Sequence, residues 1–592
     1  MKIQTLMLAA MLAGSAMPAL AASETLTIDS AATPAPVAKG DLPRQLDPAA
    51  RERYRAIFAS IRAGDWTAAT TQLDAMPEGA LHAVARAELY LAKGSPKVEL
   101  APLIALIEKA PELPEAAKLA QLAKTRGAEA LPALPVARDL VRIAGPSKRQ
   151  RARSTRSDTA AAALAIEALP LVKGDRPSDA EALLNARAYE LTPEAQTEWQ
   201  QRIAWSYYLA GDDVSARRLA TQARGGSGEW TVQADWVAGL AAWRQHDCNA
   251  AAEAFSSVAA RARDSEMTAA GLFWTARADM ACGRPERVQT RLRSASRLPE
   301  TFYGLLAGGA LGTAPPAPEK RPELAAGDWS QLSQRPNIRA ATALAEIGEG
   351  ALADMLLKHQ ARIGETRDHE ALLHLAARLN LPATQIWLAQ NCPAGARMSA
   401  NARYPSPGWT PQGGWRVDKA LVYAHALQES QFRTDAVSPA GARGLMQLMP
   451  GTAQLIARRR GESVDRVALN DPALNFEYGQ SYLQELAGFS GTGGLLPKVI
   501  AAYNAGPGSV ANWNARGRNL NDPLLFIESI PFVETRAYVA IVLRNYWMYQ
   551  RQTGAPSASL KAMAQGMWPR FPGLAGQTAV RLDSLGQTAS VD

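Results

Sequence analysis

The sequence predicts a mainly α-helical protein, with a long helical superhelix or solenoid ahead of a compact C-terminal domain that is also helical. Three observations support this fold class. Over residues 48–400, alanine and leucine dominate and apolar residues recur at spacings of three and four, the pattern of amphipathic helices. No useful stretch of that region alternates with the period of two typical of strands. At 403–414, proline and glycine residues interrupt the helical pattern, and tyrosine, asparagine, glutamine and glycine become more frequent beyond it.

Length and composition indicate a folded chain of several domains. With 592 residues, the chain exceeds what one hydrophobic core normally accommodates. Its content of 47% hydrophobic and 20% charged residues is that of a globular protein and not of a disordered one. We expect the helical region at 48–400, the C-terminal domain at 401–555, and a loosely attached tail at 556–592, which is sparse in large apolar groups.

The N-terminus has the pattern of a secretory signal peptide over residues 1–22. Lys2 provides the positive start, an apolar run from Leu6 to Met17 follows, and small residues at 19–21 suit cleavage. Residues 23–47 are small, polar and proline-containing, which predicts a flexible leader. An uncleaved anchor is the alternative, although the apolar run is short for a membrane span. We therefore expect an exported chain that is soluble after cleavage.

Three cysteines lie in the part of the chain expected to be exported. An oxidising compartment would permit one disulfide and leave one thiol over. Cys248 and Cys282 are the better pair, because they are predicted to lie on neighbouring helical hairpins, and Cys392 would then be the free thiol. Three buried, unpaired thiols are the alternative, and the sequence does not decide between the two. The spacing of the cysteines and histidines matches no metal-binding motif.

A loose repeat is visible inside the helical region. Turn residues begin at Gly211, His246 and Gly283, roughly 35 residues apart, and each turn is followed by a helical pattern. The spacing is typical of helical hairpins that each bury one face on the next, as in tetratricopeptide-like solenoids. Such a stack presents an extended curved surface. That surface could bind a protein partner or could serve only as a scaffold.

The net charge of +8 and the pI near 9.3 favour an anionic partner. For an exported protein, this favours cell-wall polymer or a membrane surface over nucleic acid. The stretch 148–156 contains five of the basic residues and could attract an anionic polymer. Runs of this kind are more often solvated loops, and we favour that interpretation for this stretch.

One glutamate has surroundings that suit acid catalysis. Residues 415–432 are predicted to form a helix, with Glu429 near its C-terminal end and close to Val422 and Ala426. Burial among apolar groups, with no lysine or arginine on that turn, would raise the pKa of its carboxyl group. A carboxylic acid that stays protonated near neutral pH can protonate a leaving oxygen. Most helical glutamates are solvated surface residues, so this interpretation depends on the motifs around it.

Four motifs in the C-terminal 150 residues or so supply that context. They are ESQF (429–432), SPAGARGLMQLMPGTA (438–453), AAYNAGPGSV (501–510) and ESIPFVETRAYV (528–539). In order and spacing, this set resembles the successive motifs of the soluble lytic murein transglycosylases. That family has a lysozyme-like catalytic domain behind a large helical superhelix. The resemblance therefore implies a lysozyme-like α catalytic domain at 401–555.

The resemblance assigns expected roles to eight residues. It implies that Glu429 is the catalytic acid and base. The other seven positions are implied to bind substrate or to support the cleft: Ser438 near the substrate N-acetyl group, Gln447 and Met449 along the glycan groove, Tyr503 beside the catalytic glutamate, Glu534 as a second acidic residue that orients sugar, and Asn504 and Tyr538 as cleft supports. Three of them have structural alternatives. Met449 could belong to the core, Asn504 could cap its own turn, and Glu534 could pair with Arg536 or another cation.

The reaction implied is non-hydrolytic cleavage of the bond between N-acetylmuramic acid and N-acetylglucosamine in peptidoglycan. Because only one carboxyl group is well placed by motif, the N-acetyl group of the substrate is expected to take the part of the nucleophile. No metal or cofactor is implied. We expect a periplasmic monomer that acts on peptidoglycan glycan strands. A lysozyme-type muramidase and a non-catalytic glycan-binding scaffold are the alternatives, and the choice between exolytic and endolytic cleavage stays open.

Overall fold

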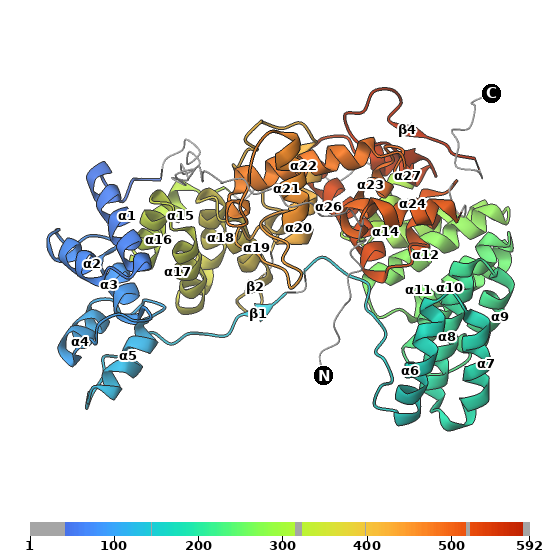
Figure 1. Ribbon diagram of the computed structural model, residues 1–592, viewed down its shortest axis with the longest axis horizontal. Helices are drawn as coiled ribbons and strands as arrows, with labels where there is room; N and C mark the ends of the chain where they lie inside the picture. The colour runs from blue at the N-terminus through green and yellow to red at the C-terminus, as the bar shows by residue number, and fades with distance from the viewer. Residues whose placement is uncertain (1–41, 144, 314–322, 397, 517–520, 584–592) are drawn as a thin grey trace, which may run out of the picture.

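The computed structural model describes residues 42–583, apart from 144, 314–322, 397 and 517–520, and it is helical almost throughout (Figure 1). This confirms the predicted mainly α class. The predicted signal peptide and residues 23–41 of the predicted leader lie outside the described residues. None of the described helices is both long and apolar enough to cross a membrane.

The helices are numbered in chain order. The first group is α1 (Pro48–Ala63), α2 (Trp66–Asp74), α3 (His82–Leu91), α4 (Leu100–Lys109) and α5 (Ala116–Thr125). The second is α6 (Thr159–Lys173), α7 (Pro177–Arg187), α8 (Pro193–Ala210), α9 (Asp213–Arg224), α10 (Trp230–Arg244), α11 (Cys248–Arg261), α12 (Ser265–Ala281), α13 (Pro285–Ser296) and α14 (Phe302–Ala310). The third is α15 (Ala326–Leu332), α16 (Pro336–Glu346), α17 (Gly350–Ile363), α18 (His369–Arg378) and α19 (Pro382–Gln390).

The C-terminal part contains α20 (Lys419–Glu429), α21 (Pro450–Arg459), α22 (Pro472–Gly488), α23 (Leu496–Ala505), α24 (Pro507–Ala515), α25 (Pro523–Glu528), α26 (Val533–Thr553) and α27 (Ala558–Ala564). In the described residues, the strands form two short antiparallel pairs: β1 (Val141–Arg142) with β2 (Asn391–Cys392), and β3 (Trp568–Pro569) with β4 (Ala579–Val580). Short 3-10 turns lie at 188–190, 366–368, 400–403 and 468–470.

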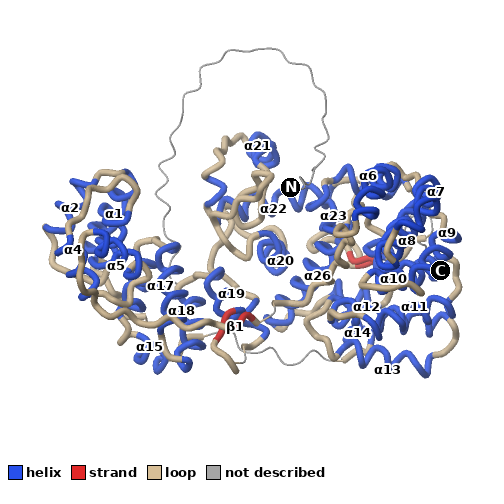
Figure 2. The backbone as a smooth tube through the Cα atoms, turned by 90° about the horizontal axis from the view of Figure 1, so that it is seen from below, coloured by secondary structure: helices blue, strands red, loops and turns tan. Residues whose placement is uncertain are grey.

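The helices of residues 48–400 bury their apolar faces in two separate cores. The helices α1–α5 share one core with α15–α19, through residues such as Ile57 and Leu356. The helices α6–α14 share the other core with the C-terminal part, through residues such as Trp274 and Trp547. Figures 1 and 2 show these groups at opposite ends of the molecule, with α20–α22 between them. The chain therefore crosses from one end to the other after α5 and returns before α15.

The predicted repeat corresponds to three helical hairpins, α8–α9, α10–α11 and α12–α13, which pack in succession. Asp212 and Asp247 cap the second helix of the first two hairpins, accepting hydrogen bonds from the backbone amides of Ser215 and Ala250 at 2.9 and 3.0 Å. Such caps satisfy backbone N–H groups that have no partner within the helix. The repeat interpretation is confirmed at these positions.

The expected cysteine pairing is also present. A disulfide joins Cys248 at the start of α11 to Cys282 at the end of α12, and Cys392 is a buried free thiol. The two half-cystines belong to neighbouring hairpins, as the repeat predicts. The alternative of three unpaired thiols is therefore wrong.

A segment of residues 145–156, here called the strap, leads from β1 toward α6, and hydrogen bonds join it to α8 and α12 (Figure 1). Just before it, β1 pairs with β2 beside α19. Within it, Arg149 is only partly exposed, and its guanidinium forms an ion pair with the fully buried Glu528 at 2.6 Å. The prediction of a solvated loop is therefore wrong for Arg149, because the partner of this residue is distant in sequence.

Beyond residue 556, the described chain packs against the rest of the protein. The helix α27 contacts α14, and Met563 and Trp568 are fully buried. The ring of Trp568 lies 5.4 Å from that of Phe526, between ring centroids. This part differs from the loosely attached tail that we expected from its few apolar residues, because those few are the ones that pack.

Candidate active site

The helix α20 ends at the residue predicted to be catalytic. Its N-terminus is capped by Asp418, which accepts a hydrogen bond from the amide of Ala420 at 2.9 Å. The helix is shorter than the predicted 415–432, because Gln431 and Phe432 have φ values of 53° and 61°. Residues other than glycine rarely adopt this left-handed backbone conformation, which cannot continue an α-helix. Glu429 is therefore the last residue of α20 and faces a loop.

The surroundings of Glu429 hold its carboxyl group in the neutral form up to about neutral pH. Burial, together with the charge of Glu534, raises its pKa from 4.5 to about 7, against a smaller opposing effect of Tyr538. The hydroxyl of Tyr538 donates a hydrogen bond to Oε1 of Glu429 at 2.6 Å, which favours the charged form. The raised pKa that the sequence predicted is confirmed.

Two aromatic rings pack beside Glu429 without adding a positive charge. The hydroxyl of Tyr503 donates to the carbonyl of Met446 at 2.8 Å, and the negative charge of Glu429 adds to the burial that raises the pKa of Tyr503. The ring of His425 lies one turn before Glu429, with its centroid 4.9 Å from that of Tyr503. Burial lowers the pKa of His425 to about 4, so its imidazole is neutral at physiological pH.

His425 was missed by sequence reasoning. Its Nδ1 shares a hydrogen bond with the carbonyl of Leu421 at 2.9 Å, whereas its Nε2 is buried and without a partner among the described residues. The only signal in the sequence was a polar residue on the apolar face of the helix. Because the ring is neutral, it leaves the raised pKa of Glu429 in place.

The loop after α20 is held in one conformation by backbone geometry. Gly444 has a φ of 74°, and a Cβ atom there would lie 2.2 Å from the side-chain amide nitrogen of Asn475. Gln447 also has a positive φ, 47°, and its side-chain amide donates to the backbone carbonyls of Ala436 and Gly444 at 3.0 and 2.9 Å. The oxygen of Ser438 accepts from the amide of Ala442 at 3.0 Å. Glycine at 444 thus permits a close approach of the backbone to Asn475 that a side chain would prevent.

Another contact joins the last turn of α23 to the start of α26. The hydroxyl of Thr535 donates to the side-chain oxygen of Asn504 at 2.6 Å. Asn504 thus bonds to a residue of α26, whereas the sequence had offered a cap within its own turn. The bond fixes α26, and with it Tyr538, relative to the end of α23.

A cavity of about 800 Å³ opens beside Glu429. Six of the eight predicted site residues line it: Glu429, Ser438, Gln447, Asn504, Glu534 and Tyr538. Tyr503 does not line it, and its ring packs against those of His425 and Tyr482. Met449 does not line it either; its side chain is 41% exposed, which excludes the alternative that it belongs to the core.

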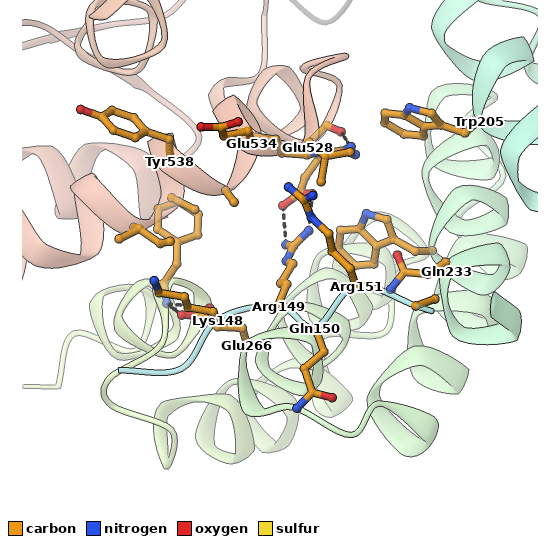
Figure 3. Close-up of a pocket in the computed structure, with 18 of the residues that line it drawn as sticks. Lys148, Arg149, Gln150, Arg151, Trp205, Gln233, Glu266, Glu528, Glu534 and Tyr538 are labelled. Atoms are coloured by element: carbon orange, nitrogen blue, oxygen red, sulfur yellow. Dashed lines mark hydrogen bonds and ion pairs between the residues drawn. The ribbon is translucent and has the colours of Figure 1, made fainter. Parts of the chain in front are cut away.

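The opposite side of the cavity comes from the helical region, which sequence reasoning did not place near Glu429. Figure 3 shows Glu534 and Tyr538 on one side and the strap, with Lys148, Arg149 and Arg151, on the other. Arg149 binds both carboxylate oxygens of Glu528, at 2.6 and 2.7 Å. The ion pair joins the strap to the end of α25, just before the helix that bears Tyr538.

The environment of Arg536 excludes its pairing with Glu534, which was the structural alternative for that glutamate. Its guanidinium lies 4.3 Å from the ring centre of Trp205 in α8 and donates to the backbone carbonyl of Glu528 at 3.3 Å. Among the described residues no ion pair joins Arg536 to Glu534, whose side chain is exposed. Glu534 is therefore available to a ligand in the cavity.

Comparison with known proteins identifies the domain that contains Glu429. Residues 411–526 match the family model of the Transglycosylase SLT domain. The chain is similar to the soluble lytic murein transglycosylases of Escherichia coli K12, at 41% identity over 156 residues, and of Salmonella typhimurium, at 37% over 163 residues. Each match covers 26% of this chain and 24% of the relative, so the chain spans about a quarter of the length of these relatives.

The likeness of the fold extends over most of the chain. The crystal structure of the 70-kDa soluble lytic transglycosylase of Escherichia coli superimposes with a TM-score of 0.51, over 88% of this chain and 99% of that chain. The lytic transglycosylase Slt of Pseudomonas aeruginosa superimposes with the same score, over 86% of this chain and 87% of that chain. At 18% and 20% identity, these comparisons show a shared helical fold. The predicted resemblance to soluble lytic murein transglycosylases is confirmed.

Proposed function

We propose that this protein is a peptidoglycan lytic transglycosylase in which Glu429 is the acid and then the base. The observation that carries the proposal is the carboxyl group of Glu429, which lies at the wall of a large cavity with its pKa raised to about 7. A proton donor of that pKa suits cleavage of a glycosidic bond near neutral pH. The similarity of residues 411–526 to the Transglycosylase SLT domain supports glycan as the substrate class.

In the first step, Glu429 donates its proton to the oxygen between N-acetylmuramic acid and N-acetylglucosamine. The bond from that oxygen to C1 of the muramoyl residue breaks, and the carbonyl oxygen of the neighbouring N-acetyl group bonds to C1. The resulting oxazolinium ion carries the positive charge. The hydroxyl of Tyr538 then donates its hydrogen bond to a Glu429 carboxylate, which it stabilises as the charge develops.

In the second step, the Glu429 carboxylate removes the proton from the C6 hydroxyl of the same muramoyl residue. The C6 oxygen attacks C1, the bond from the N-acetyl oxygen to C1 breaks, and a 1,6-anhydro ring closes. Glu429 has regained its proton and no water is consumed, so the reaction is that of a lyase. Ser438, Gln447, Asn504 and Glu534, which line the cavity, would position the sugar, and we assign Tyr503 to the support of Glu429.

The test is mass spectrometry of the products formed from purified peptidoglycan by wild type and Glu429→Gln. The matched control is Glu370→Gln, which changes an exposed glutamate of α18 outside the cavity. We expect anhydromuramoyl ends from wild type and from the control, and none from Glu429→Gln. Activity retained in Glu429→Gln would contradict the role of the residue. Reducing ends would indicate a muramidase, and strand binding without products from any variant would indicate a glycan-binding scaffold.

We further propose the domain limits and the cellular location that the sequence predicts. Residues 1–22 would be a cleaved signal peptide, residues 48–400 the helical region and 401–555 the catalytic domain. A periplasmic location is supported by the disulfide between Cys248 and Cys282, because disulfides persist in oxidising compartments. The protein would act as a monomer, and the curved helical region would be the surface open to a protein partner.

A further inference from the structure

A second cavity, of about 940 Å³, lies apart from the one that contains Glu429. The two cavities have no lining residue in common. The helices α8, α10 and α12 reach both of them, with earlier turns at the cavity of Glu429 and their C-terminal ends at the second cavity. The volume of the second cavity is within the range of sites that hold small organic ligands. It is therefore a candidate binding site that the proposed reaction does not use.

Three parts of the chain that are distant in sequence form the second cavity. The helices α10 and α12 contribute Trp243 and Arg277, and α25 contributes Leu524. The segment after α26 contributes Gln565, which follows α27, and Arg581, which follows β4. A ligand in this cavity would contact all three parts at once.

The rim of the second cavity is held by a covalent bond and by strand pairing. Cys248 lines the cavity, and its disulfide to Cys282 joins the start of α11 to the end of α12. Arg581 directly follows β4, in which Val580 pairs with the fully buried Trp568. A ligand would therefore meet backbone that is already ordered, which lowers the entropy cost of binding.

The lining of the second cavity has more positive than negative charge. Arg277 forms an ion pair with Asp522 at 2.7 Å, and Nε of Arg244 donates to Asp213 at 2.8 Å. Arg581 is the third arginine of the lining, and its side chain is exposed. Within the described residues, Arg581 forms neither an ion pair nor a side-chain hydrogen bond. Since the two pairs cancel, the charge of Arg581 favours a ligand with one anionic group.

The other accessible groups of the lining suit a ligand with hydroxyl groups. The side-chain amide of Gln565 is exposed and can both donate and accept hydrogen bonds, as a hydroxyl group can. The side chain of Arg277 is 22% exposed and has further N–H donors besides the one that binds Asp522. The partly exposed indole of Trp243, whose ring centre lies 4.9 Å from the guanidinium of Arg277, adds apolar surface. A ring that bears several hydroxyl groups and one carboxylate matches this lining.

We propose that the second cavity binds a small acidic saccharide, with Arg581 on its carboxylate group and with Gln565 and Arg277 on its hydroxyl groups. The identity of the saccharide rests on the proposed function. The reaction proposed above releases soluble sugars that end in an anhydromuramoyl residue, and the lactyl group of that residue carries a carboxylate once its peptide has been removed. The second cavity would thus give the enzyme a place to bind a product away from Glu429.

The test is a calorimetric titration of the full-length protein with the disaccharide of N-acetylglucosamine and 1,6-anhydro-N-acetylmuramic acid. The same disaccharide with its lactyl carboxylate converted to a neutral amide is the second probe. Arg581→Gln removes the exposed cation, and Ala281→Trp places a large side chain at an exposed position of the cavity wall. The matched control is Lys561→Gln, which removes an exposed charge of α27 outside the cavity.

We expect wild type and Lys561→Gln to bind the disaccharide at two sites, one in each cavity. Arg581→Gln should weaken one of them by about 10- to 100-fold, as for the loss of a hydrogen bond between charged groups. The neutral amide should bind that site in wild type as weakly as the disaccharide does in Arg581→Gln. Ala281→Trp should retain only the other site.

A single site in wild type, or two sites that Arg581→Gln leaves unchanged, would overturn the proposal. Because the disaccharide is prepared without the enzyme, its binding can be measured whether or not the protein has the proposed lyase activity. A failure of that activity is seen separately, in the products that wild type forms from peptidoglycan.

Discussion

Removal of the Tyr538 hydroxyl should move the pH profile of the reaction to higher pH. In Tyr538→Phe, the carboxylate of Glu429 loses a hydrogen bond of 2.6 Å that favours its charged form. A hydrogen bond to a charged group contributes about 1.5–3 kcal/mol, which corresponds to roughly 1–2 pKa units. The pKa of Glu429 should therefore rise above its value of about 7 by that amount.

The sign follows from the state that the reaction needs. In the proposed mechanism, Glu429 must be protonated to cleave the bond, so kcat/KM should fall as pH rises through its pKa in the free enzyme. Tyr538→Phe should shift that alkaline limb upward. Glu534→Gln should shift it downward, because the negative charge of Glu534 helps to raise the pKa of Glu429.

The assay is kcat/KM for release of anhydromuramoyl products, measured from pH 5 to pH 10. Tyr549→Phe is the matched control, since its buried hydroxyl, also on α26, bonds to the carbonyl of Pro405 at 3.0 Å and not to Glu429. Opposite shifts for Tyr538→Phe and Glu534→Gln, with no shift in the control, are expected. An alkaline limb that stays in place in Tyr538→Phe, or that moves to lower pH, would refute the reasoning. Glu429 would then not be the catalytic acid, or the hydroxyl of Tyr538 would not stabilise its carboxylate.

Three further changes have defined outcomes. Because the raised pKa of Glu429 disfavours its charged form in the folded state, the cost to stability grows as pH rises from 4.5 to about 7. Glu429→Gln should therefore raise the free energy of unfolding at pH 8 by roughly 1–3 kcal/mol, a range that allows for partial exposure of the carboxyl group. At pH 4 it should cause no such gain, and calorimetry at the two pH values measures the difference. Gly444→Ala should destabilise the fold by at least about 2 kcal/mol, from its positive φ and the contact with Asn475, with a lower thermal midpoint as the readout; an unchanged midpoint would argue against this loop geometry. Replacing Cys248 and Cys282 by serine should cost up to about 4 kcal/mol for a 34-residue loop, seen as a lower urea midpoint of the first transition.

The sequence predicted the parts of the fold that depend on local patterns. Caps and turns such as Gly211 and Asp247 mark helix ends through interactions within a few residues, and the period of three and four places the apolar faces. The division into two cores was not predictable in this way. It depends on α1–α5 packing against α15–α19, which lie more than 200 residues later, and periodicity carries no record of the partner of an apolar face.

The candidate site was predictable on one side only. The motifs located Glu429, Gln447 and Tyr538, and the apolar surroundings of Glu429 predicted its raised pKa. The other wall was missed because Arg149 and Glu528 are 379 residues apart, and a basic run has no local feature that distinguishes a solvated loop from one that binds a buried acid.

The ion pair between the strap and α25 also bears on when the site would be assembled during the export that we propose. A chain that crosses a membrane with its N-terminus leading presents Arg149 long before Glu528 and Tyr538 have emerged. Until then, Arg149 lacks its ion-pair partner and Glu429 lacks its hydrogen-bond donor. With the export and the function that we propose, the cleft would reach its final form only when nearly the whole polypeptide has been delivered, and a protein interrupted in transit would be inactive.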